Sequence, residues 1–108
     1  MLANNFRLFQ ETEDKLKRFK KQTGISPNIS SRIAFFSSIE SGYRYTVDEN
    51  KPDGSMNLNN SIWFGEYELL FETMLKDLYP ELNEDLLVKA WATHVKHGEN
   101  SLNIQSKL

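Results

Sequence analysis

The stretch over residues 63–78 constrains the fold most, because its apolar residues recur at helical spacing along its whole length. They are Trp63, Phe64, Tyr67, Leu70, Phe71, Met74, Leu75 and Leu78. Such spacing places them along one side of an amphipathic helix. Tyr79-Pro80 ends this helix, since a residue before proline avoids the α region. We expect the apolar side to be buried, either in the core of one subunit or between subunits.

Two shorter helices are predicted upstream of this one, each bounded by capping residues. Thr12 is the expected N-cap of a helix over residues 13–23, and Gly24 supplies the left-handed residue that follows it. The Ser26-Pro27 pair starts the next helix, because serine caps it and proline is preset for its first turn. Gly42 ends that helix.

The second half of the chain holds a loop and a last helix. Residues 43–61 lack periodicity and are rich in Asn, Asp, Gly and Pro, so we expect a long irregular loop between the second and third helices. Asn83 caps the last helix, which Gly98 ends. We therefore expect a single helical domain over residues 1–98, followed by a flexible tail over residues 99–108.

The N-terminal residues 6–10 form a short β-prone run, with Phe6 and Leu8 on one face if the run is extended. Phe9 interrupts the alternation. The predicted fold is therefore mainly α, with about four helices and a short β-prone segment at the start, as in ribbon-helix-helix proteins.

Charge is distributed unevenly along the chain. The formal net charge is −2, which taken whole argues against a nucleic-acid partner. Residues 1–25, however, hold six basic and three acidic side chains, whereas residues 26–108 hold seven and twelve. Five of the cations fall within residues 15–21, a helical length of about 10 Å, so they act together on a nearby polyanion.

The first predicted helix separates these cations from its apolar side. At 100° per residue, Leu16 and Phe19 define the buried side. The cations lie around the rest of the helix: Lys15, Lys17, Arg18, Lys20 and Lys21. One interpretation is a site for the phosphate backbone of a nucleic acid, and the other is an ordinary solvated helix face.

Several kinds of chemistry find no support in the sequence. The absence of cysteine excludes disulfides, Fe–S ligation and thiolate nucleophiles. His94 and His97 share a helix face but have no evident further ligands, so we interpret one as core-facing and the other as a helix C-terminal residue. No serine has an adjacent histidine, and the five glycines are isolated. We expect no enzymatic activity, no metal and no cofactor.

The N-terminus has no basic region followed by an apolar run, and no window approaches about 18 consecutive apolar residues. We therefore expect a soluble cytoplasmic protein.

Two segments of the chain resemble the DndE family of DNA phosphorothioation proteins. The first is the run Leu16-x-x-Phe19-Lys20-x-x-Thr23-Gly24-Ile25-x-Pro27-Asn28-Ile29-x-x-Arg32-Ile33-Ala34, and the second is Gly65-Glu66-Tyr67 followed by Leu70-Phe71. They occur in the family's order, and the resemblance extends to about Gly98.

This resemblance implies a small helical protein that assembles into a homotetramer. It would act in a bacterial system that replaces a non-bridging phosphate oxygen of DNA with sulfur, alongside a cysteine desulfurase, an Fe–S protein and an ATPase-like partner. The family's small subunit is credited with binding DNA, preferably nicked duplex, through surface lysines. A chain without cysteine agrees with a division of labour in which other proteins handle sulfur.

Matching the family's basic helix onto this chain gives the candidate DNA-binding residues Lys15, Lys17, Arg18, Lys20 and Lys21. Arg7 is a secondary candidate because it precedes the helix. Arg32 lies inside the shared motif, but its neighbours are of core type, so we assign it to structure or to subunit contacts.

The sequence thus predicts a non-catalytic DNA-binding subunit of the phosphorothioation machinery. Two alternatives stay open: an interaction adaptor within the same complex, and a ribbon-helix-helix regulator. The second fits less well, because its exposed strand face would carry Asn5, Arg7 and Phe9, and an apolar ring is a poor reader of bases.

Overall fold

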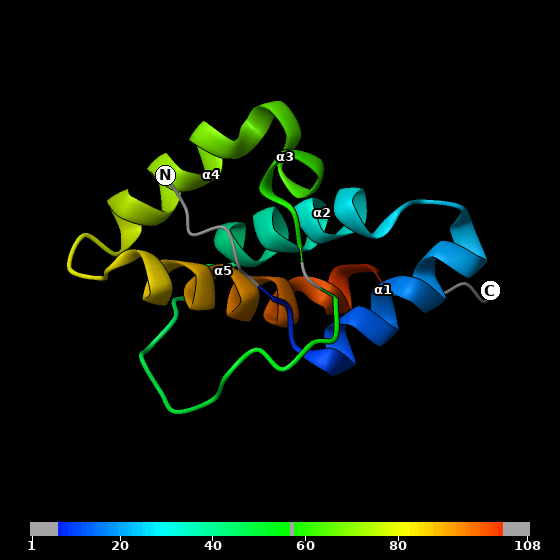
Figure 1. Cartoon of the computed structure of the whole chain (residues 1–108), viewed down its shortest axis with the longest axis horizontal. Helices are drawn as coiled ribbons and strands as arrows, with labels where there is room; N and C mark the ends of the chain where they lie inside the picture. Colours follow the sequence, from blue (N-terminus) through cyan, green and yellow to red (C-terminus); the bar gives the residue numbers. More distant parts are fainter. Residues whose placement is uncertain (1–6, 57, 103–108) are drawn as a thin grey trace.

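The computed structural model describes residues 7–56 and 58–102, and it is mainly helical (Figure 1). Its elements in chain order are α1 (Gln10–Thr23), α2 (Pro27–Glu40), α3 (Asn60–Trp63), the 3-10 helix η1 (Gly65–Tyr67), α4 (Glu68–Leu78), α5 (Glu84–Gly98) and the 3-10 helix η2 (Glu99–Leu102). The described part contains no β-strand. The mainly α prediction is confirmed, with five α-helices in residues 7–56 and 58–102 where about four were expected.

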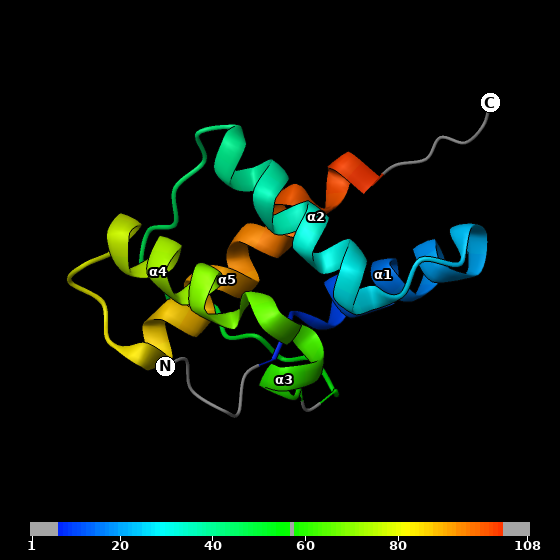
Figure 2. The same ribbon diagram turned by 90° about the horizontal axis from the view of Figure 1, so that it is seen from above.

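Helices α2 and α5 pack against each other at the centre of the molecule, and the other elements surround them (Figures 1 and 2). Helix α3 contacts α2, α4 contacts α5, and α1 contacts α2 at one end. The largest fully buried apolar side chains come from four of the helices and from the segments beside them: Leu8, Leu16, Phe35, Phe64, Phe71, Leu75, Leu87 and Trp91. The hydrophobic effect therefore joins segments that are far apart in the sequence.

Gly98 sets how closely α2 and α5 can approach. It is the last residue of α5, and a Cβ atom there would overlap the backbone carbonyl of Ala34 in α2. The sequence marks Gly98 as the end of a helix, and the structure adds that a side chain would not fit.

The N-terminal run does not form the expected strand. Residues 7–9 are irregular, Gln10 already belongs to α1, and Phe6 lies outside the described residues. Leu8 and Phe9 are adjacent and both buried, whereas a half-buried strand alternates. The ribbon-helix-helix start is therefore wrong for this chain.

Helix α1 begins before the predicted N-cap. Thr12 is fully buried within the helix, and Phe9 occupies the N-cap position without a side-chain hydrogen bond. Instead, the Gln10 backbone N–H donates to Oδ1 of Asp53, 2.9 Å away, in the long loop. The cap thus comes from a distant segment. At the other end Gly24 adopts a φ of 80°, which confirms the predicted left-handed residue.

The long loop between α2 and α3 is irregular, as predicted, and it is anchored to α1. The fully buried carboxylate of Glu13 accepts hydrogen bonds from the Ser55 hydroxyl at 3.3 Å and the Met56 backbone N–H at 3.1 Å. The Gly54 N–H donates to the Leu8 carbonyl at 2.8 Å. These bonds compensate for burying the charge.

The predicted continuous helix over residues 63–78 is interrupted. Gly65 adopts a φ of 58°, which ends α3 and starts η1 before α4 begins. The Arg32 guanidinium covers the open end of α3, because its Nε donates to the Trp63 carbonyl at 3.1 Å. Arg32 therefore has a structural role, as predicted, although the reason differs: its neighbours Ile29, Ile33 and Phe36 are exposed and do not belong to the core. Downstream, Asn83 caps α5 as predicted, accepting from Leu86 N–H at 2.9 Å.

The segment after Gly98, which the sequence places in a flexible tail, is folded as far as Leu102. Helix η2 contacts α1, α2 and α5, and Leu102 packs against the core. Residues 103–108 lie outside the described part.

His94 lies at the centre of a buried polar network. The Tyr45 backbone N–H donates to the Tyr79 hydroxyl at 2.7 Å, and this hydroxyl lies 2.7 Å from His94 Nε2. Ser38 Oγ lies 2.8 Å from His94 Nδ1 and 2.9 Å from His97 Nδ1. If Tyr79 donates to Nε2, then Nδ1–H donates to Ser38 and Ser38 donates to His97, so each group is satisfied.

The interpretation of one core-facing and one C-terminal histidine is confirmed, because His94 is fully buried and His97 is exposed in the last turn of α5. A serine–histidine contact does exist, which the sequence could not show, because the two residues are 56 positions apart. Ser38 is only 1% exposed, so a substrate has no access to it.

We expect the stability of the protein to fall when His94 is forced to take a proton. Burial, reinforced by Arg44 and His97, lowers the pKa of His94 from 6.5 to about 4. The unfolded chain therefore binds this proton at higher pH than the folded one. Between pH 6.5 and pH 4 the free energy of unfolding should fall by up to about 3 kcal/mol from this group alone.

Urea unfolding of the wild type and of His94→Gln over this pH range measures the effect, because carboxylates titrate equally in both proteins. The variant should be less stable than the wild type at pH 7, and the difference between their free energies of unfolding should narrow toward pH 4. A difference that stays constant with pH would contradict a lowered pKa of His94 in the folded protein.

We also expect Gly98→Ala to destabilise the protein by about 3 kcal/mol, because backbone atoms of α2 occupy the space that the new methyl group needs. Gly42→Ala is the matched control. Gly42 has a φ of 90°, but a Cβ there meets nothing within 4 Å, so only the backbone conformation is strained, at about 1 kcal/mol. If both variants lose the same stability in thermal or urea unfolding, the contact between Gly98 and the Ala34 backbone is not tight.

Candidate nucleic-acid interface

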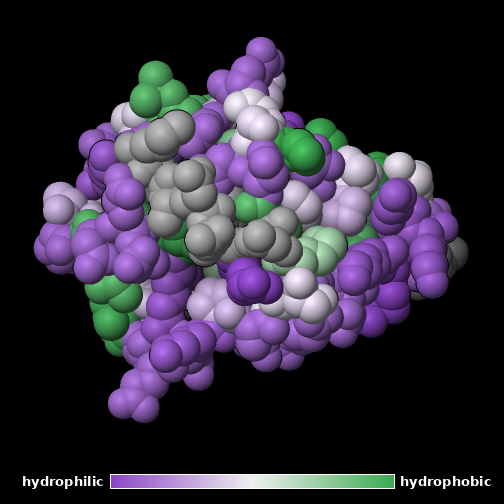
Figure 3. Space-filling view, viewed as in Figure 1, coloured by the Kyte–Doolittle hydropathy of each residue, from purple (hydrophilic) through white to green (hydrophobic). Residues whose placement is uncertain are grey.

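The cations of α1 point away from the core, as the helical periodicity predicts. Leu16 is fully buried and Phe19 is half-buried, which identifies the packed side of the helix. The five basic residues are all exposed: Lys15, Lys17, Arg18, Lys20 and Lys21. In the space-filling view the end of the molecule that carries α1 is covered by hydrophilic residues (Figure 3).

One of these five cations is neutralised by an acidic partner. Lys15 Nζ lies 2.7 Å from Oε2 of Glu99 in η2, and the Glu99 side chain is almost completely buried. The carboxylate therefore offsets the charge of Lys15, while the exposed ammonium keeps N–H donors for a second acceptor. Within the described residues the other four cations make no ion pair, and we call Lys17, Arg18, Lys20 and Lys21 the basic surface.

In the described part of the chain the acidic residues of α1 form no ion pair with the basic surface, and each has another partner. Glu11 pairs with Lys96 of α5 at 2.6 Å, and Glu13 holds the loop. Asp14 accepts a hydrogen bond from Gln10 at 3.1 Å. Acidic groups early and basic groups late in a helix also suit its macrodipole, which is the structural role of this arrangement.

Lysines in other elements behave differently from those of the basic surface. Lys76 pairs with Glu72 at 2.8 Å, and Lys89 pairs with Asp48 at 3.3 Å. Lys96 is paired with Glu11, and its Nζ also lies 4.9 Å from the centre of the Phe9 ring. In the described part of the chain, positive charge is therefore compensated on α4 and α5 but left without ion pairs on α1, except at Lys15.

Arg7, the secondary candidate, is not grouped with the basic surface. It is exposed, and its Nη1 donates to the Gly54 carbonyl at 2.9 Å. It precedes the first turn of α1, whereas the basic surface occupies the C-terminal half. Its position suits holding the loop.

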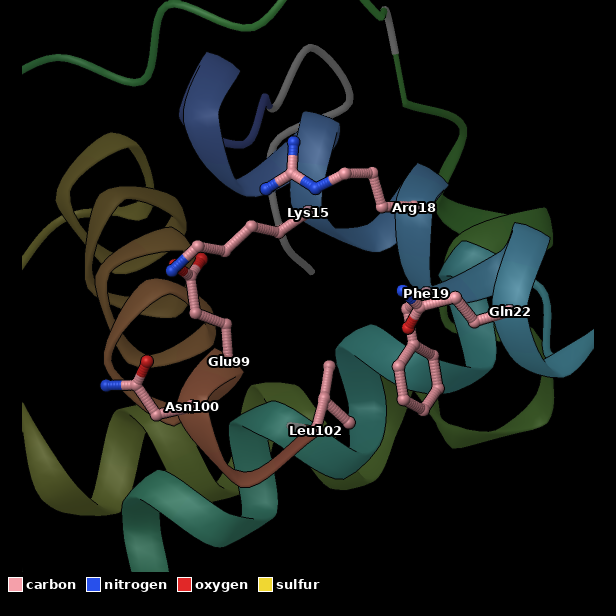
Figure 4. Close-up of a pocket in the computed structure, with 7 residues that line it drawn as sticks. All are labelled: Lys15, Arg18, Phe19, Gln22, Glu99, Asn100 and Leu102. Carbon is pink, nitrogen blue, oxygen red and sulfur yellow. The ribbon is translucent and has the colours of Figure 1, made fainter. Parts of the chain in front are cut away.

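A hollow of about 420 Å³ opens beside Lys15, between α1 and η2 (Figure 4). Seven residues line it: Lys15, Arg18, Phe19, Gln22, Glu99, Asn100 and Leu102. Sequence reasoning missed the three residues of η2 because it assigned them to the tail. No sequence signal pairs Glu99 with Lys15, which lies 84 positions earlier.

No group of three or more His, Cys, Asp or Glu side chains in the described residues is placed to hold a metal ion. Within the same ranges, no helix has the length and apolar character needed to cross a membrane.

The chain is similar to known proteins in both sequence and structure. The model of the family described as DNA sulphur modification protein DndE matches residues 5–108. No match is found among curated proteins.

Two solved structures are similar over nearly the whole chain. The crystal structure of DndE from Escherichia coli B7A, involved in DNA phosphorothioation modification, is 47% identical, with a TM-score of 0.88 over 94% of this chain and 98% of that one. The crystal structure of a DndE variant with glycines replaced by lysine, involved in DNA phosphorothioation, is 46% identical, with a TM-score of 0.85. The match covers 94% of this chain and 99% of that one. The chain therefore belongs to the DndE family of DNA sulphur modification proteins, which agrees with the resemblance of its two sequence motifs.

Proposed function

We propose that this protein is a non-catalytic DNA-binding subunit of the phosphorothioation machinery, and that its basic surface contacts the phosphate backbone independently of sequence. The observation that carries the proposal is the exposure of Lys17, Arg18, Lys20 and Lys21 without acidic partners in the described part. Lysine and arginine that contact phosphates release condensed counterions, which favours binding to any duplex.

The chemistry of the chain supports a binding role over a catalytic one. It has no cysteine, so it offers no thiolate to carry sulfur. Its buried histidine and serine are inaccessible. The sulfur transfer itself is then the task of other proteins of the system, a cysteine desulfurase, an Fe–S protein and an ATPase-like partner. This chain would hold their DNA substrate in the cytoplasm.

We further propose nicked duplex as the preferred DNA. Intact and nicked duplexes offer the same phosphates, and they differ in flexibility and in the end groups at the nick. Competition between the two forms for the wild-type protein measures this preference directly.

Reversal of charge on the basic surface should abolish DNA binding. Lys17→Glu with Lys21→Glu removes two phosphate contacts and adds two repulsive charges, so retention of duplex or nicked DNA in a gel-shift assay should be lost. Lys51→Glu with Lys76→Glu is the matched control, since it changes the net charge equally but lies off α1. Equal loss in both variants would mean that overall charge, not this surface, governs binding.

The salt dependence of wild-type binding should also be steep. Log K should fall with log salt by about 0.9 for each phosphate contacted, a slope near 4 for the four cations. A flat dependence would exclude the backbone as the main contact.

We also propose that the protein assembles into a homotetramer through an apolar patch on α2 and on the segment from α3 to α4. These elements face the viewer in Figure 2. Large apolar side chains there are between 37% and 73% exposed: Ile29, Ile33, Phe36, Ile62, Tyr67, Leu69 and Leu70. Exposed apolar clusters of this kind mark protein interaction sites. The apolar stripe is thus divided, with Phe71 and Leu75 in the core and Leu70 on the surface.

Light scattering tests the assembly. Ile33→Lys with Leu70→Lys should reduce the mass to that of a smaller species, because charges in an apolar interface are costly. Val47→Lys, at an exposed apolar residue outside the patch, should leave the mass unchanged. A monomeric wild type would instead assign the patch to another protein, the adaptor alternative.

A further inference from the structure

The hollow between α1 and η2 lies next to the basic surface, and its lining differs from that surface. Figure 4 shows Lys15, Glu99, Leu102 and Phe19 arranged around it, with Arg18 extending along α1 toward Lys15. A backbone contact needs only exposed cations. This hollow adds apolar walls and a buried acid, so it suits a ligand with more than a phosphate.

Two cations stand at the rim of the hollow. Lys15 and Arg18 are both exposed, and Glu99 holds Lys15 in place through their 2.7 Å ion pair. A guanidinium offers a planar fork of donors that matches phosphate oxygens, and an ammonium adds a point charge. The rim is therefore suited to one phosphate group.

The walls below the rim are apolar. Phe19 comes from α1 and Leu102 from η2, and both are half-buried. An aromatic ring that is partly exposed in a basic groove is the usual platform for an unstacked nucleobase. A base inserted here would cover the exposed parts of both side chains.

Glu99 supplies the polar feature of the hollow. The residue is only 8% exposed, and its Oε2 binds Lys15. Its other oxygen, Oε1, is buried and accepts no hydrogen bond within the described part of the chain. An unsatisfied buried acceptor is costly, so a ligand that brings an N–H donor to Oε1 gains that free energy.

We propose that the hollow binds a single unpaired nucleotide whose base carries an exocyclic amine. Its phosphate lies at Lys15 and Arg18, its base between Phe19 and Leu102, and its amine at Glu99. This rests on the proposed DNA-binding function and deepens it, since base pairing and stacking in an intact duplex leave neither the ring face nor a whole nucleotide free.

Cytidine and thymidine monophosphates are the matched probes. At ring position 4 cytosine presents an amine donor and thymine presents the O4 acceptor, which repels a carboxylate. Thymine keeps an N3–H donor, but O4 lies beside it, so the carboxylate favours cytosine. In a titration followed by NMR of the full chain, dCMP should shift amide signals of α1 and η2 around the hollow. It should bind at least about fivefold more tightly than dTMP. Inorganic phosphate should not reproduce the shifts around Leu102.

Three variants separate the contributions. Phe19→Leu keeps an apolar side chain but removes the ring, and should weaken dCMP binding at least about fivefold, whereas Phe19→Tyr should retain it. Glu99→Gln should make dCMP and dTMP bind equally, because an amide both donates and accepts. Lys76→Ala is the control, since Lys76 is an exposed lysine of α4 that does not line the hollow, and its loss should leave dCMP binding unchanged.

Equal binding of dCMP and dTMP by the wild type, or equal shifts with inorganic phosphate, would overturn the proposal. The same holds if Phe19→Leu and Phe19→Tyr bind dCMP alike. These outcomes are independent of the gel-shift assay with duplex DNA. A protein that binds duplex but shows no dCMP site refutes this inference alone, and one that binds no duplex refutes the proposed function.

Discussion

The close packing of α2 against α5 at Gly98 and Ala34 is the contact on which the positions of the surrounding elements depend. Because the backbones touch there, the chain leaves α5 directly beside α2 and turns at once into η2. That turn brings Glu99 to Lys15 on α1. A residue with a side chain at position 98 would separate the two helices and move η2 away from α1, so the fold of the core and the shape of the candidate site are linked.

Local sequence signals were sufficient to predict a helix end where residues close in sequence form the hydrogen bonds of the terminal backbone groups. Gly24 and Asn83 end and begin helices through contacts within a few residues, and both were predictable. The start of α1 was not, because the group that receives the Gln10 N–H is Asp53, 43 residues away. The break at Gly65 was missed for a related reason. Helical spacing of apolar residues continues across it, and it is the distant Arg32 that satisfies the open end of α3.

In the candidate site, too, some features follow from the local sequence and others depend on residues that are distant in the sequence. The outward direction of Lys17, Arg18, Lys20 and Lys21 follows from periodicity alone, since each is at a fixed angle from Leu16. Whether a cation is free depends on its neighbours in space. Lys15 has the same sequence context as the other four, yet it is held by Glu99 from a segment that composition assigned to a tail. The exposed apolar patch was predictable only in part. The helical spacing over residues 63–78 shows that one side of this segment is apolar, but packing in the folded protein decides which of its residues are buried.

The net charge of −2 conceals this arrangement because several of the acidic residues, including those that contact α1 or belong to it, are engaged within the molecule. Glu13 anchors the loop, Asp53 caps α1, and Glu11 and Glu99 pair with lysines. Each of these carboxylates stabilises the fold, and each is compensated where it lies. The cations at the end of α1 have no such partners in the described part of the chain, so the field near that surface is positive on the scale of a Debye length. A polyanion that approaches α1 meets this local field, and the distant acidic groups are screened before they can oppose it.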